Sequence, residues 1–197
     1  MTWPSVRSGP WLSPVGDRPV RPLTQDEVLR IVDAGILGED EPVELLHGVL
    51  TAVSEKTPAH EQVKLRIARW LAPGFAEGRY DTRIQAPLAV PDRTSLPEPH
   101  ISIVERDDTV AHPVTALLVG EVAVSSLRID TAIKPALYAA AGVPELWVID
   151  VPGHAVRVFA DPRPEGYTTT RTVREGAITP SAVEAEPLDT AALLAGL

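Results

Sequence analysis

The sequence predicts an α/β (α+β) fold with one mixed central β-sheet flanked by helices. Segments with helical periodicity alternate with short apolar segments along the chain, an order typical of this class. Two apolar segments, residues 116–124 and 145–151, carry very few charges, as expected for central strands covered on both faces. The length of 197 residues suits one domain, or at most two small ones.

Two helices are predicted in the first half of the chain. The first covers residues 25–34, because Thr24 precedes Glu27 by the three residues of a capping box. The second begins at Pro58, has apolar residues near a 3.6-residue period, and is expected to end at Pro73-Gly74.

Short apolar or alternating segments predict the strands. Residues 43–53, interrupted by His47-Gly48, predict either two strands with a tight turn or one bent strand. The other expected strands cover residues 79–90, 101–104, 116–124, 145–151, 154–160 as a hairpin partner, and 167–173 as an edge strand.

The two ends of the chain and one further helix complete the prediction. Residues 1–22 contain five Pro and two Trp without an apolar period, so we expect an irregular N-terminal arm. Residues 130–141 predict a helix in which Pro135 removes one backbone hydrogen bond, which indicates a kink or a late start. The last residues, 176–197, form an acidic extension with a short helix over 188–194.

The composition excludes several classes of protein. Without Cys there is no disulfide framework, thiol nucleophile, Cys zinc site or iron–sulfur cluster. No apolar run approaches the roughly 18 residues of a membrane span, and the N-terminus has no apolar signal segment. We therefore expect a soluble, cytoplasmic protein with no membrane partner. A P-loop, a dinucleotide fingerprint and a serine-hydrolase elbow are also absent from the sequence.

The charge is unevenly distributed. The net charge is −9, but residues 56–93 hold seven basic and four acidic side chains, a local surplus of +3. This surplus is either an ordinary solvated helix face or a contact surface for the DNA backbone. The DNA contact, if present, is expected to use Lys64, Arg66, Arg69 and Arg83.

Three charged residues in apolar surroundings are candidate site residues. Glu121 interrupts the apolar segment 116–124, where a carboxylate is costly unless it pairs with a cation or binds a metal. Glu44 enters an apolar strand and is either a solvated strand end or a functional carboxylate. Lys134 follows Asp130 by four residues, the spacing of an ordinary helix-surface ion pair, and is either that or a catalytic lysine.

The order of these residues resembles the Uma2 family of endonucleases, within the PD-(D/E)xK restriction-endonuclease-like superfamily. The resemblance covers about residues 23–175 and is most specific from Glu121 to Asp150, where EVAVSS, DTAIK, LYAAAGVPE and WVID keep the family's spacing. The other matching segments are VELLHGVL (43–50), PAHEQVKLRIARWL (58–71), PEPHISIV (97–104) and HAVRVFA (154–160).

The resemblance implies a restriction-endonuclease-like core over residues 23–175 and metal-dependent hydrolysis of DNA phosphodiester bonds. In such a site, carboxylates at neighbouring strand ends hold Mg²⁺ or Mn²⁺ beside a lysine. Carried over by position, Glu44, Glu121 and Lys134 match the family's catalytic residues, and Glu121 would also bind the metal. Analogy with fold relatives further suggests a homodimer.

One position departs from the family pattern. Where the family has Pro-Asp before a strand, this chain has Pro99-His100, so an imidazole stands where a metal-binding Asp is expected. Mg²⁺ requires oxygen ligands, so the change favours a softer ion such as Mn²⁺ or no productive metal. Glu98, two residues earlier and on the same face of an extended strand, is a candidate replacement ligand. His47 is a second departure, because the family usually has an acidic residue there.

Three functions follow from these observations. The first is a metal-dependent DNA endonuclease with a degenerate metal site at Glu121, His100 and Glu98. The second is a catalytically inactive nuclease-fold module that binds nucleic acid or a protein partner. The third is a structural or interaction protein with no role in nucleic-acid chemistry.

Overall fold

The computed structural model describes residues 21–38, 40–53 and 57–197. The expected N-terminal arm therefore lies outside the described residues, except for its last two positions. The described chain forms two compact units. Unit 1 contains the described residues up to 53 together with 92–96, and unit 2 contains 57–91 and 97–197.

Unit 1 contains a capped helix and a hairpin. Helix α1 covers Gln25–Asp33, and its capping box is present: the Glu27 amide donates to Thr24 Oγ1 at 3.3 Å and the Thr24 amide donates to Glu27 Oε2 at 3.0 Å. Strands β1 (Val43–Leu46) and β2 (Val49–Ala52) pair antiparallel. The structure thus shows two strands with a tight turn. His47 and Gly48 have φ angles of 49° and 80°, as a two-residue hairpin turn requires.

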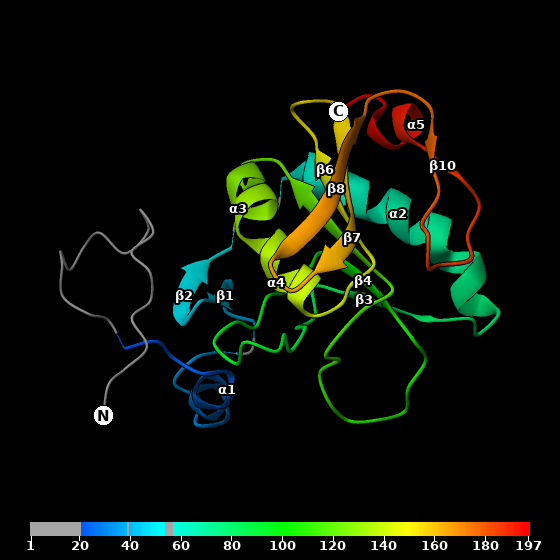
Figure 1. Ribbon diagram of the computed structural model, residues 1–197. Coiled ribbons are helices and arrows are strands. Elements are labelled where there is room, and N and C mark those ends of the chain that lie inside the picture. The colour runs from blue at the N-terminus through cyan, green and yellow to red at the C-terminus, as the bar shows by residue number, and fades with distance from the viewer. Residues whose placement is uncertain (1–20, 39, 54–56) are drawn as a thin grey trace. The chain divides into compact units, whose positions relative to one another are not determined.

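Unit 2 is built on a six-stranded mixed sheet with the order β3-β4-β5-β6-β7-β8 (Figure 1). Strands β5 and β6 are parallel, and the other neighbours are antiparallel. Every residue of β5 and β6 is buried, as the apolar segments predicted. The strands are β3 (Asp81–Ile84), β4 (Ile101–Val104), β5 (Leu118–Ala123), β6 (Glu145–Asp150), β7 (Ala155–Arg163) and β8 (Gly166–Val173).

Helices cover both faces of this sheet. One face carries α2 (Pro58–Ala76) and α5 (Thr190–Leu194), whose apolar residues share one core with alternate residues of β4–β7. The pair α3 (Leu127–Ala132) and α4 (Lys134–Ala140) contacts β5–β8 (Figure 1). A two-stranded pair, β9 (Ala177–Ile178) with β10 (Leu188–Asp189), precedes α5. None of the described helices is long and apolar enough to cross a membrane.

The structure corrects three predicted boundaries. Helix α2 passes through Pro73-Gly74 to Ala76, and its last turn is stabilised by the Tyr80 hydroxyl, which donates to the Leu71 carbonyl at 2.9 Å. The strand expected over 79–90 is shorter, because only Asp81–Ile84 pair with β4. The helix expected over 130–141 begins earlier and breaks into α3 and α4 at Ile133, which confirms the kink predicted from Pro135.

The close approach of Gly74 and Tyr80 yields a stability prediction. A Cβ at Gly74 would overlap the buried Tyr80 ring, whereas a Cβ at Gly120 would meet Ile101 Cβ at an ordinary 3.8 Å. Overpacking lowers stability by about 1–3 kcal/mol, whereas the higher helix propensity of Ala raises it by only about 1 kcal/mol. We expect Gly74→Ala to lower the free energy of unfolding in urea by about 1 kcal/mol. The matched Gly120→Ala should change it less; equal effects would contradict the packing seen here.

Candidate functional site

Glu121 lies at the centre of unit 2, on β5. Alternate residues of a strand point to opposite faces, and the neighbours Gly120 and Val122 lie on the side of the core formed with α2. Glu121 therefore points to the other face, where α4 packs. Its exposed fraction is 0%, so its charge must be compensated by other groups of the protein.

Helix α4 supplies two of the groups that bind this carboxylate. Lys134 Nζ donates to Glu121 Oε1 at 3.0 Å, and the Tyr138 hydroxyl donates to the same oxygen at 2.6 Å. Residues four apart lie on one face of a helix. The break before Lys134 thus places an ammonium group and a phenol side by side over β5.

His100 supplies the donors to the second oxygen. Its backbone amide donates to Glu121 Oε2 at 3.3 Å, and its Nδ1 lies 2.5 Å from the same atom. The Val122 amide lies 3.2 Å from Nδ1 and can donate only to an unprotonated nitrogen. An ionised carboxylate accepts hydrogen bonds and cannot donate them. The short contact to Glu121 therefore assigns the proton to Nδ1 of His100.

The pKa of Glu121 follows from these contacts. Burial alone would raise the pKa, but Lys134 and His100 favour the charged form, as does the hydrogen bond from Tyr138. The net effect lowers the pKa of Glu121 to about 2. Glu121 is thus an ionised, internally compensated carboxylate.

Asp130 is a second buried carboxylate at this site. The Ser126 hydroxyl donates to its Oδ2 at 2.6 Å, while Oδ1 lies 3.5 Å from Lys134 Nζ and accepts no hydrogen bond among the described residues. Burial and the charge of Glu121 raise the pKa of Asp130 to about 6, despite the nearby Lys134. The predicted pair of Asp130 and Lys134 is confirmed, but it is buried rather than on the helix surface.

A second histidine contacts the first. The rings of His60, in the first turn of α2, and His100 have centroids 4.4 Å apart at an interplanar angle of 70°. His60 Nδ1 lies 3.3 Å from Glu61 Oε1. Burial lowers the pKa of His60, and the charge of His100 lowers it further. His60 was not a predicted site residue.

The residues proposed to contact DNA have different environments. Lys64 is buried, donates to Gln85 Oε1 at 2.8 Å and pairs with Glu61 at 2.9 Å, so it does not belong to the solvated surface expected from the sequence. Arg66 is half-buried and donates to the Leu193 carbonyl at 2.7 Å. Arg69 on α2 is exposed, and Arg83 on β3 is half-buried. A role in DNA binding stays a prediction for all four residues.

The remaining predicted site residues are Glu44 and Glu98, whose roles stay predictions. Glu44 is a β1 residue of unit 1, and Glu98 is half-buried before β4. Among the described residues, no group of three or more His, Asp or Glu side chains is arranged to hold a metal ion. Both oxygens of Glu121 accept hydrogen bonds from the protein. This donor set does not fit Mg²⁺, which requires several oxygen ligands with free lone pairs.

Sequence reasoning found the pair of Glu121 and Lys134 but missed Tyr138 and His60. Tyr138 has a usable signal, because it follows Lys134 by four residues on the helix after the Glu121 strand. His60 has no such signal, because its contact with His100 joins positions 40 residues apart in the sequence.

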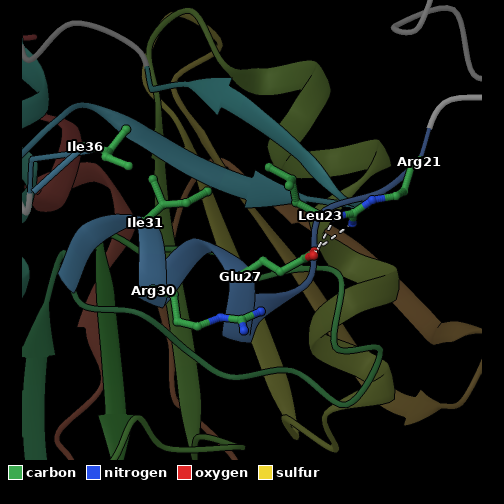
Figure 2. Close-up of a pocket in the computed structure, with 6 residues that line it drawn as sticks. All are labelled: Arg21, Leu23, Glu27, Arg30, Ile31 and Ile36. Atoms are coloured by element: carbon green, nitrogen blue, oxygen red, sulfur yellow. Dashed lines mark hydrogen bonds and ion pairs between the residues drawn. The ribbon is translucent and has the colours of Figure 1, made fainter. Parts of the chain in front are cut away.

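Unit 1 has a pocket of its own, and its lining includes none of the residues around Glu121. Figure 2 shows its lining by Leu23, Ile31 and Ile36, with Arg30 and the ion pair of Arg21 and Glu27 at 2.6 Å. The hydrogen bond from Arg21 lowers the pKa of Glu27 to about 2. None of the predicted site residues lines this pocket.

Comparisons with known proteins concern both fold and family. The family model Uma2, described as "Putative restriction endonuclease", matches residues 26–190. A crystal structure of a "putative nuclease belonging to DUF820" from Anabaena variabilis ATCC 29413 superposes with a TM-score of 0.72 at 16% identity. The similarity covers 88% of this chain and 98% of that one. At this identity it shows a shared fold. No curated protein matches the chain.

The raised pKa of Asp130 predicts a specific pH dependence. An acid with a higher pKa in the folded state binds more protons there, so folding gains stability as the pH falls from about 6 toward the unfolded value of 3.8. Glu121, Lys134 and His100 face this carboxyl and are left intact by Asp130→Asn. We therefore compare the free energy of unfolding of the wild type with that of Asp130→Asn. The difference, wild type minus variant, should increase as the pH falls from 7 to 5. A constant difference would show that Asp130 titrates normally.

Proposed function

The chain belongs to the Uma2 family, and on this basis we propose that it is a degenerate metal-dependent DNA endonuclease whose phosphodiester hydrolysis with Mg²⁺ or Mn²⁺ is impaired. One observation carries the proposal: His100 presents an N–H donor, 2.5 Å from Glu121 Oε2, at the position where the family has a metal-binding carboxylate.

The nuclease assignment is supported by two residues that still match the family pattern, Glu121 and Lys134. Glu121 lies within central strand β5, its Oε1 is 3.0 Å from Lys134 Nζ on α4, and both side chains are buried. In the family resemblance these are the central-strand carboxylate and the lysine of the following helix. An ammonium group at this place can stabilise negative charge that develops on a phosphate. The chain thus retains part of the catalytic apparatus.

The proposed loss of metal binding has a direct electrostatic cause. A metal ligand must offer a lone pair, but Glu121 is bound by three side-chain donors of the chain itself. Binding a cation would require at least one of these bonds to break inside a buried site, which is costly. Mn²⁺ accepts imidazole nitrogen more readily than Mg²⁺ does, so any residual activity should be higher with Mn²⁺.

A second function is favoured by the same saturation of Glu121. A carboxylate that is fully compensated by Lys134, Tyr138 and His100 needs no metal to be stable, which suits an inactive nuclease-fold module that binds nucleic acid or a protein partner. Plasmid nicking by the wild type in Mn²⁺ separates the two functions: slow but measurable nicking that Glu121→Gln abolishes supports the degenerate enzyme, and none supports the module.

Restoring the oxygen ligand should restore activity. His100→Asp replaces the donor with a carboxylate and releases Glu121 Oε2, so we expect plasmid nicking in Mg²⁺ to rise at least about tenfold above the wild type. Adding Glu121→Gln to that variant should remove the gain. His112→Asp, at a half-buried loop histidine that is not among the groups bound to Glu121, makes the same substitution outside this cluster and is the matched control. Nicking by His100→Asp no faster than by the wild type, in a folded protein, would refute the proposal.

DNA binding gives a separate prediction for the basic residues. Arg69 and Arg83 are accessible, whereas Lys64 is held by Glu61 and Gln85. We expect the double variant Arg69→Glu/Arg83→Glu to weaken binding to a short duplex about tenfold or more at low salt. The dependence of affinity on salt should fall by about one unit of slope per residue. Arg171→Glu, on the exposed part of β8, is the control. If the wild type, the double variant and Arg171→Glu bind the duplex equally well, Arg69 and Arg83 do not contact DNA.

A further inference from the structure

The six-stranded sheet of unit 2 has two edges of different kinds. At one edge, β3 has only four residues, and two of them, Asp81 and Arg83, are charged. At the other edge, β8 has eight residues, GYTTTRTV, with a single charge. Short length and charged side chains protect a sheet edge from pairing with another chain, and β8 lacks this protection. We propose that β8 is an interaction surface that pairs antiparallel with β8 of a second copy of this chain.

The outer side of β8 is open to an added strand. Its inner side pairs with β7. In the part of the chain that the structure describes, β8 forms no backbone hydrogen bond with any other segment. Residues 168–172 are all exposed, and they include side chains on both faces of the sheet. The strand therefore presents backbone N–H and C=O groups to solvent, which is what an added strand binds.

The composition of β8 favours pairing. Four of its eight residues are Thr, which has a high propensity for strands and forms stabilising Thr–Thr contacts across them. Neither Pro nor Lys, the residues that commonly block edge pairing, is present in the strand. The edge is thus chemically able to continue the sheet.

Contacts within unit 2 also hold β8 in place before any partner binds. The Tyr167 hydroxyl donates to the Val143 carbonyl at 2.9 Å. Thr168 Oγ1 donates to the Asp161 carbonyl at 3.1 Å, and Thr169 Oγ1 donates to Asp161 Oδ2 at 2.6 Å. Because the strand is already ordered, less conformational entropy is lost when a second strand is added.

The charges near the two ends of β8 select a second copy in the antiparallel orientation. Glu165 directly precedes the strand and is exposed, and Arg171 is exposed near its far end. A two-fold axis at Thr168 places Glu165 of each copy opposite Arg171 of the other, because both positions are equally distant from Thr168 in the sequence. Opposite charges across a strand pair are stabilising, and like charges are destabilising. Parallel pairing in register would instead place like charges side by side.

The geometry of this contact sets its size and stoichiometry. The same strand contributes on both sides of the two-fold axis, so the contact closes at two copies. A contact centred on one strand from each copy is smaller than a standard protein interface, and such contacts are weak. We therefore expect a reversible dimer with a dissociation constant of about 1–100 μM.

Sedimentation of the full-length protein over a range of concentrations tests for this dimer. Thr168→Lys places two ammonium groups opposite each other at the proposed axis, so association should weaken at least about threefold. Thr109→Lys, at an exposed Thr in the loop after β4, makes the same change of charge and should associate like the wild type. Circular dichroism checks the fold of both variants.

Disulfide formation tests the register of the pairing. The chain has no Cys, so a single introduced thiol can form a disulfide only between two copies. Opposed Cα atoms of antiparallel strands lie about 4.5–5.5 Å apart, within the range that a disulfide can bridge. Under mild oxidation we expect Thr168→Cys to form a covalent dimer at least about tenfold faster than Thr172→Cys. In the proposed register the two copies of Thr172 are about 27 Å apart along the strands.

Three results would overturn the inference. They are a monomer at every concentration up to about 1 mM, association of folded Thr168→Lys as strong as that of the wild type, and cross-linking of Thr168→Cys no faster than that of Thr172→Cys. The inference is independent of the proposed nuclease function, because neither readout requires nicking of DNA.

Discussion

A negative charge buried on a central strand is the constraint on which this site depends. Glu121 has no access to solvent, so the protein must supply the hydrogen bonds and positive charge that water would otherwise provide. It does so with Lys134 and Tyr138 on one oxygen and His100 on the other. Removing one partner would leave an uncompensated charge, at a typical cost of about 3–5 kcal/mol.

The same constraint explains local features of the chain. Pro135 cannot donate a backbone hydrogen bond, and the helix accordingly breaks at Ile133. The break makes Lys134 the first residue of α4, with its ammonium group 3.0 Å from Glu121 Oε1, and places Tyr138 one turn later. Asp130, in α3, shares Lys134 with Glu121. One ammonium group thus serves two carboxylates, and the second has the raised pKa.

The sequence predicted the features that depend on local patterns and motifs. These include the mixed sheet, the capping box at Thr24, the break near Pro135 and the proximity of Lys134 to Glu121. It did not predict that Lys64 is buried against Gln85, or that His60 meets His100, because such contacts depend on how distant segments pack. The motif marked His100 as an imidazole in place of a metal-binding Asp; it gave no sign that the ring nitrogen Nδ1 lies 2.5 Å from Glu121 Oε2.

The proton on His100 is the most direct test of this account. Long-range proton–nitrogen NMR correlation of the imidazole rings distinguishes the two tautomers at neutral pH. The account predicts a protonated Nδ1 on His100, with its proton signal shifted by the hydrogen bond to Glu121 and altered in Glu121→Gln. A proton on Nε2 alone would contradict it, because Nδ1 would then accept from the Val122 amide and could not donate to Glu121.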